Sequence, residues 1–117
     1  MIYPVNSTLS ALSAYYTKLN VVSDNIANVI TDDFKKSRAI MSEGPYNTVQ
    51  ANVQQINTPG ILHEEWREGE LTEVETSNVD LAEEIPQLII TKHAYAANMA
   101  VLRTYDEVLG TMLDIMG

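Results

Sequence analysis

The chain has 117 residues, which suits a single domain, and it carries a formal net charge of −9 with no cysteine. The acidic excess lies in residues 64–117, where twelve acids face three bases, and this charge disfavours nucleic acid and anionic membrane surfaces as partners. The lack of cysteine excludes disulfides and thiolate metal sites, and no apolar run approaches the ~18 residues needed for direct membrane insertion. The first residues also lack the basic and apolar segments of a secretory signal peptide.

Apolar residues near the start of the chain recur at alternating spacings of three and four, which indicates the seam of a coiled-coil helix. This first seam consists of Leu12, Tyr15, Leu19, Val22, Ile26 and Val29. We expect a helix of about 23 residues that begins after an N-cap at Asn6 or Ser7 and ends near Asn28.

Residues 31–78 differ in character from the helical segments on either side. From Val49 to Gln54, apolar and polar residues alternate with a period of two, which predicts a strand with one solvated face. Gly44-Pro45 and Pro59-Gly60 predict turns on either side of this strand. The stretch Gly69–Thr76, with Leu71 and Val74 as its apolar residues, predicts a weaker second strand.

The same segment offers little for catalysis or metal binding. His63 and Glu64 begin a sequence like the zinc motif HExxH, but the second histidine is required at position 67, which is Arg67. We therefore interpret residues 63–66 as a solvated acidic loop, and we expect no catalytic residue, metal site, cofactor or small-molecule substrate. The basic stretch Lys35–Arg38 is complementary in charge to the acidic run Glu64–Glu75, which predicts a contact within or between chains.

A second seam with the same alternation runs from residue 81 to the end of the sequence. Lys92 and Asp106 are its two polar breaks, and its apolar positions are Leu81, Ile85, Leu88, Tyr95, Met99, Leu102, Leu109, Leu113 and Met116. Asp80 and Glu83 predict a capping box at the start of this helix. Pro86 predicts either a kink or a helix that begins at Pro86 itself.

Beside the second seam runs another apolar stripe in the last four turns. It consists of Val101, Tyr105, Val108, Met112 and Ile115. Two adjacent stripes indicate that the C-terminal half of this helix faces more than one partner. The apolar face also continues to Met116, although a monomer's end is usually polar and frayed.

Two motifs lie where the helical segments meet the middle of the chain. Residues 23–39 read SDNIANVITDDFKKSRA, and residues 77–98 read SNVDLAEEIPQLIITKHAYAAN. They resemble, in the same order, the motifs SxNIANxNTxGFK and SNVDLxEExxxxIxxQRAYEAN of the bacterial flagellar basal-body rod and hook proteins. The matching positions are Asn25, Ile26, Ala27, Asn28, Thr31, Phe34, Asn78, Asp80, Ala94, Tyr95 and Asn98.

The chain departs from this family pattern at a few positions. Ile30 stands where the family usually has asparagine, and Asp33 where it usually has glycine, so we expect a strained left-handed conformation at Asp33. For the motif asparagines Asn25, Asn28 and Asn98 two interpretations stay open. They either hydrogen-bond across subunits and fix the register, or they are a helix cap and solvated side chains.

The resemblance implies a mainly α-helical fold in which residues 1–30 and 79–117 pair as an antiparallel coiled coil and form one domain. Residues 31–78 would form a short β-containing, partly extended connection between these helices. The resemblance further implies a structural subunit that self-assembles through its terminal helices into the axial tube of the basal-body rod.

Partners and location follow from the same resemblance. The partners would be other rod and hook subunits and further copies of this chain, and the location the periplasm-spanning rod, reached through the flagellar type III export apparatus. The short middle segment favours a proximal-rod-like member of the family. The alternative is a soluble helical adaptor or flagellar export chaperone that uses the same amphipathic helices.

Overall fold

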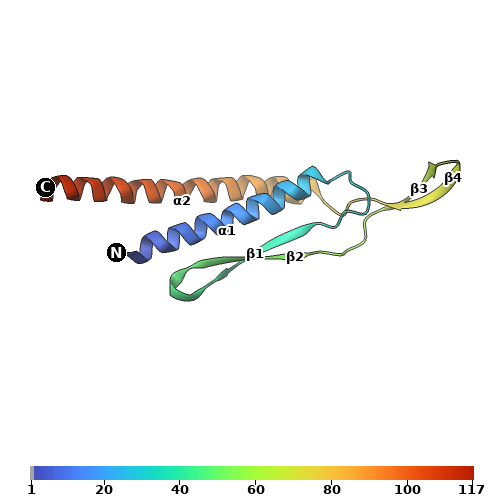
Figure 1. The fold of residues 1–117 in the computed structure, drawn as a ribbon. Helices are drawn as coiled ribbons and strands as arrows, with labels where there is room; N and C mark the ends of the chain where they lie inside the picture. Colours follow the sequence, from blue (N-terminus) through green and yellow to red (C-terminus); the bar gives the residue numbers. More distant parts are fainter. Residues whose placement is uncertain (1) are drawn as a thin grey trace.

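The computed structural model describes residues 2–117, with side chains from Val5 onward, as an elongated molecule of 78 × 24 × 22 Å (Figure 1). Along the chain, two helices flank a middle segment that consists of two separate antiparallel hairpins. The elements in chain order are α1 (Ile2–Ala27), β1 (Ser37–Glu43), the 3₁₀ turn η1 (Pro45–Asn47), β2 (Val49–Gln55), β3 (Leu62–Arg67), β4 (Glu70–Glu75) and α2 (Leu81–Met116).

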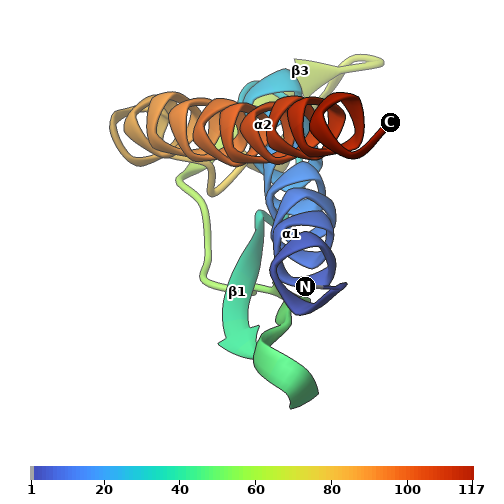
Figure 2. The same cartoon turned by 90° about the vertical axis from the view of Figure 1, so that its left-hand side faces the viewer.

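The two helices lie side by side and run in opposite directions (Figures 1 and 2). At 1.5 Å per residue the 36 residues of α2 span about 54 Å and the 26 residues of α1 about 39 Å, so α2 extends beyond α1 at its C-terminal end. The predicted helix start at Pro86 is wrong, because α2 is continuous from Leu81 through Pro86. One lost backbone bond is tolerated in a long helix that is capped at Asp80.

Helix α1 begins earlier than the sequence predicts. Its first residue is Ile2, so Asn6 and Ser7 lie inside the helix rather than at its N-cap. The proline at position 4 then falls in the first turn, where its missing N–H has no helical acceptor to lose. The hydroxyl of Ser7 instead donates to the carbonyl of Asn47 at 2.8 Å and ties α1 to η1.

The hairpin β1–β2 packs along α1. Its face toward the helix includes Ala39 and Met41 on β1 and Val49 and Ala51 on β2, which are buried or half-buried. The amide of Val49 donates to the hydroxyl of Ser10 at 3.0 Å and fixes the hairpin against the helix. The predicted strand is thus confirmed as β2.

The hairpin β3–β4 projects from the opposite end of the molecule to the two chain termini (Figure 1). A two-residue turn joins its strands, with positive φ values of 52° at Glu68 and 84° at Gly69, as this tight turn requires. The predicted weak strand is confirmed as β4. The predicted acidic loop at residues 63–66 is wrong in its secondary structure, because these residues form β3, although every residue of that strand is exposed.

The apolar core is thin and lies mainly along α1. Within the described residues, the buried apolar residues are Ala11, Leu12, Ala14, Val22, Ala39 and Val74. Alanines on α1 let the neighbouring backbones come close but contribute little apolar area each. The two largest side chains with less than 2% exposure are polar, Asn25 and Thr91. Polar contacts therefore carry an unusual share of the packing between elements.

Candidate assembly site

The first seam lies on the packed side of α1. Leu12 and Val22 are buried, whereas Tyr15, Leu19 and Ile26 are half-buried. Val29 follows the end of the helix at Ala27 and is also half-buried in the turn. Helix α1 contacts both α2 and the β1–β2 hairpin.

The residues of α2 that pack on α1 have a heptad spacing of their own. Every second position coincides with a position of the second seam, and the positions between lie one residue earlier in the sequence. Its buried and half-buried residues are Glu84, Leu88, Thr91, Tyr95, Asn98, Leu102 and Tyr105, and Ala94 beside them is also half-buried. Leu88, Tyr95 and Leu102 belong to both sets, whereas Leu81, Ile85 and Met99 of the second seam are exposed. Lys92 and Asp106, the polar breaks of the second seam, are exposed on the outside of the helix pair.

The C-terminal turns of α2 present apolar side chains to solvent. Leu109 and Leu113 of the second seam are exposed, and Met116 is 81% exposed. The neighbouring stripe is also exposed at Val101, Val108, Met112 and Ile115. A shallow groove lined by Ala100, Val101, Thr104, Tyr105 and Val108 runs along this face. A contiguous exposed apolar surface of this kind marks an interaction site in a soluble protein.

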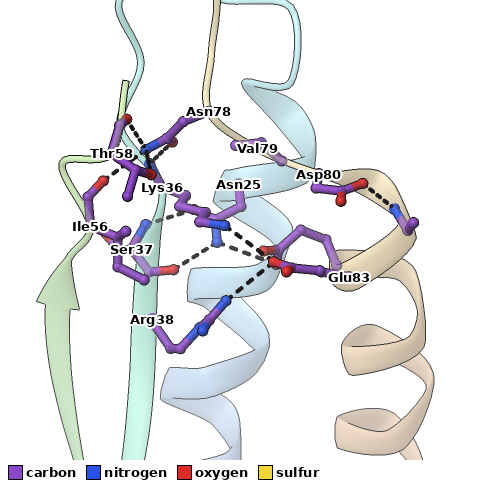
Figure 3. A network of polar contacts seen from close by, with 12 residues as sticks. Asn25, Lys36, Ser37, Arg38, Ile56, Thr58, Asn78, Val79, Asp80 and Glu83 are labelled. Atoms are coloured by element: carbon purple, nitrogen blue, oxygen red, sulfur yellow. Dashed lines mark hydrogen bonds and ion pairs between the residues drawn. The ribbon is translucent and has the colours of Figure 1, made fainter. Parts of the chain in front are cut away.

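Asn25 joins three elements at the other end of the helix pair (Figure 3). Its side chain is 1% exposed, and its amide nitrogen donates to the carbonyl of Ser37 on β1 at 2.8 Å and to a carboxylate oxygen of Glu84 on α2 at 3.3 Å. Its Oδ1 accepts from the amide of Ser37 at 3.0 Å. Asn25 therefore pairs with β1 as a neighbouring strand would. It is not a solvated side chain, and all these bonds lie within the chain.

Asn78 closes the same region from the loop before α2 (Figure 3). Its Oδ1 accepts from the amide of Lys36 at 2.7 Å, and its Nδ2 donates to the carbonyls of Ile56 and Thr58 at 2.8 and 2.9 Å. It therefore holds the start of β1 beside the end of β2. We call Asn25, Asn78 and Glu84 the polar clamp.

The cap of α2 differs in detail from the predicted capping box. Asp80 accepts from the amide of Ala82 at 2.9 Å, so it is the N-cap residue. The carboxylate of Glu83, however, does not reach back to Asp80. It pairs with Lys36 at 3.1 Å and with Arg38 at 3.3 Å, because these cations on and beside β1 lie close to the first turn of α2.

The remaining motif residues shape the turn after α1 or contact their own helix. Asn28 donates to the carbonyl of Asp24 at 2.8 Å and accepts from the hydroxyl of Thr31 at 3.1 Å, so it caps the helix end. Asp33 has φ 61°, the left-handed conformation that the sequence predicts there. Asn98 donates to the carbonyl of Ala94, one turn earlier in α2, at 2.9 Å. Ile26 and Phe34 are half-buried, whereas Ala27 is exposed.

Ion pairs connect the middle segment to the rest of the chain. Lys35 pairs with Glu75, so the predicted contact between the basic stretch and the acidic run exists within the chain at this one pair. Lys35 holds the pKa of Glu75 below its usual value, and the amide of Gly60, which donates to the same carboxylate at 2.8 Å, adds to this effect. Arg67 pairs with Asp32 at 2.6 Å and Glu65 at 3.0 Å, and hydrogen bonds to both raise its pKa.

The residues of the HEEW stretch do not converge. Along β3 the side chains alternate, so His63 and Glu65 lie on one face of the hairpin and Glu64 and Trp66 on the other. Within residues 2–117, no three potential ligands of the types His, Cys, Asp and Glu gather in a metal-binding geometry. In the same range, no helix is both long enough and apolar enough to cross a membrane.

Sequence reasoning missed Ser37 and Glu84, which join elements through Asn25, and the buried Thr91. Glu84 and Thr91 follow the same heptad spacing as Leu88, Tyr95 and Leu102, but they are polar, and an apolar pattern passes over them. Ser37 contributes its backbone, which no side-chain pattern reveals.

Two family models match the chain, one at each end. The model described as flagella basal body rod protein matches residues 6–35, which run from α1 through the turn at Asp33. The model described as flagellar basal body rod FlgEFG protein C-terminal matches residues 72–115, from β4 almost to the end of α2. No curated protein sequence matches the chain.

Together the two matches span well over half of the chain and include both helices and the polar clamp. An elongated pair of helices with an exposed apolar end agrees with a structural role. The chain belongs to the flagellar basal body rod protein family, and its role is a structural one in the flagellar basal body.

Proposed function

We propose that this chain is a rod subunit that self-assembles through its terminal helices into an axial tube. The observation that supports this most directly is the exposed apolar face of α2, which runs from Val101 to Met116 and continues past the end of α1. In a subunit stacked among others, neighbouring helices would cover this face. Burial of its large side chains would contribute roughly 1.5–3 kcal/mol each to assembly.

We further infer that α1 and α2 pack as an antiparallel coiled coil. The opposite directions of the helices and the alternating spacings of three and four on their packed sides support this. Leu12 and Val22 on α1 and Leu88 and Leu102 on α2 are the apolar knobs of that packing. Asn25 and Thr91 are its polar positions, and such positions fix the register between helices.

The partners in this proposal are other rod subunits and further copies of the same chain. The chain would reach the rod through the flagellar type III export apparatus. The middle segment consists of only two short hairpins, so no large domain extends outward from the helix pair. This supports a place among the short, proximal-rod-like subunits.

Incorporation into the basal body tests the apolar face. Leu109→Asp places a charge in that face, whereas Thr111→Asp places the same charge two residues away, on another side of α2. We expect mass spectrometry of intact basal bodies from the source bacterium to detect the wild-type and Thr111→Asp chains and not the Leu109→Asp chain. Normal incorporation of Leu109→Asp would overturn this use of the face, and absence of the wild-type chain from complete basal bodies would refute the rod role.

A further inference from the structure

The β3–β4 hairpin turns its apolar face away from the rest of the molecule. On the inner face, Val74 is 5% exposed and Arg67 reaches Asp32 in the turn after α1. On the outer face, Trp66 and Leu71 lie directly opposite each other and are 73% and 51% exposed. A hairpin that stands alone would normally solvate its polar face and bury its apolar one. The reversed arrangement indicates a docking face.

Acidic side chains surround this outer face. Glu64 and Glu73 lie opposite each other next to the Trp66–Leu71 pair and point to the same side. Residues 62–75 contain six glutamates and one arginine, and this arginine is engaged with Asp32 and Glu65. The occupant of this face must therefore offer apolar surface together with positive charge.

The chain itself carries a surface of that chemistry on α2. Ile85, Lys92, Met99 and Arg103 are spaced by seven, seven and four residues, so they form one stripe along the helix, and all four are exposed. Of the seven lysines and arginines, Lys35, Lys36, Arg38 and Arg67 have ion-pair partners. Within the described residues, Lys92 and Arg103 form no ion pair.

The hairpin cannot reach this stripe in its own chain. It extends beyond the N-terminal end of α2, in the direction opposite to the one in which the helix runs (Figure 1). The ion pair between Arg67 and Asp32 holds the base of the hairpin to the turn after α1. A contact between the two surfaces therefore requires a second molecule.

We propose that the outer face of the β3–β4 hairpin docks on the Ile85–Arg103 stripe of a second copy of this chain. Trp66 and Leu71, a cross-strand pair about 5 Å apart, contact Met99 of that copy. Glu64 and Glu73 beside them pair with its Lys92 and Arg103, which lie on either side of Met99 along the helix. The two surfaces differ, so the contact is head-to-tail and repeats from copy to copy along an open assembly. The inference rests on the proposed rod function, because it names a partner surface within that assembly.

The contact is one of several around each subunit. Two six-residue strands present a face about 20 Å long and about 10 Å wide, roughly 200 Å², which is well below the ~800 Å² per partner of a stable interface. The hairpin therefore adds orientation and register to helices that already associate. It is to be detected under conditions in which the purified chain assembles.

Disulfide formation between two single-cysteine chains tests the contact, since the chain has no cysteine of its own. Glu73→Cys lies on the outer face and Thr72→Cys, its matched control, on the inner face of the same strand. Ala96→Cys lies within the stripe, between Lys92 and Met99, and Ala97→Cys lies about 100° around the helix. Under oxidising assembly conditions, we expect the Glu73→Cys and Ala96→Cys mixture to form at least about tenfold more heterodimer than either control pairing.

Charge reversal checks the chemistry of the same contact. Lys92→Glu together with Arg103→Glu brings like charges toward Glu64, so it is expected to lower the yield of this heterodimer about tenfold or more. Equal yields from the inner and outer positions, no heterodimer in assembled protein, or a yield insensitive to charge reversal would each overturn the inference. These results are separable from the rod role, since a chain that enters basal bodies normally without this cross-link refutes only the hairpin contact.

Discussion

The polar clamp makes a quantitative prediction for Asn25→Asp, a substitution that keeps the shape of the side chain. The change removes the two amide donors that serve the carbonyl of Ser37 and the carboxylate of Glu84. Each lost hydrogen bond costs about 1 kcal/mol. It also places a second carboxylate about 3.3 Å from Glu84. At an effective dielectric of about 20, two unit charges at that distance repel by about 5 kcal/mol.

Proton uptake by one of the two carboxylates relieves part of this repulsion. We therefore expect Asn25→Asp to lower the free energy of unfolding by about 3–5 kcal/mol. The assay is urea unfolding followed by circular dichroism at one fixed, low protein concentration, because association would add to the apparent stability. Asn20→Asp is the matched control, since it makes the same chemical change on an exposed side of α1 and should stay within about 0.5 kcal/mol of wild type.

A double-mutant cycle separates the carboxylate repulsion from other effects. In the double variant Asn25→Asp with Glu84→Gln, the new glutamine amide can donate to the new carboxylate, so we expect at least about half of the lost stability to return. If Asn25→Asp were no more destabilising than Asn20→Asp, Asn25 would not hold α1, β1 and α2 together as the geometry indicates.

Two further predictions concern the turn after α1 and its ion pair. Asp33→Gly relieves the backbone strain of the left-handed conformation at φ 61° and should raise the free energy of unfolding by about 0.5–1 kcal/mol. Asp33→Ala should lower the free energy of unfolding. A loss of stability in Asp33→Gly would show that Asp33 is not strained. The lowered pKa of Glu75 means that its pairing with Lys35 stabilises the fold at pH values above the ordinary carboxyl pKa, and that this stability is lost as the pH falls through the lowered value. Glu75→Gln should therefore flatten the acid limb of a stability-against-pH curve measured by urea unfolding.

The sequence predicts local structure most reliably where only one backbone conformation fits the residue pattern. The left-handed turn at Asp33 follows from a family position that usually holds glycine, and the alternation from Val49 to Gln54 predicts β2 because only a strand puts every second residue on one face. Strands β1 and β3 are not predicted in this way. Their partners supply the pairing. In β3 the apolar residues Leu62 and Trp66 are separated by His63, Glu64 and Glu65, and all residues of the strand are exposed.

The packed side of α2 shows why a helix seam cannot be placed from apolar spacing alone. Ile85 and Met99 fit a heptad as well as Glu84 and Asn98 do, and burial would favour the apolar pair. The observed rotation places Glu84 against Asn25 instead. This rotation keeps the buried amide of Asn25 bonded to Glu84 and leaves Ile85 and Met99 on a surface that a second molecule can cover. Asn25 is in turn held by Ser37 of β1, a contact that the pattern of α2 does not contain.

The same rotation divides the molecule into two ends with different physical roles. At the end where α1 finishes and α2 begins, polar contacts and ion pairs join α1, α2 and β1 within one chain. At the other end, α2 continues past α1 with exposed apolar side chains. Hydrogen bonds need fixed geometry, which a chain can provide for itself, whereas apolar burial is non-directional and tolerates a neighbour that arrives later. This division supports a subunit whose internal geometry is set before assembly and whose free helix end is stabilised only by its neighbours.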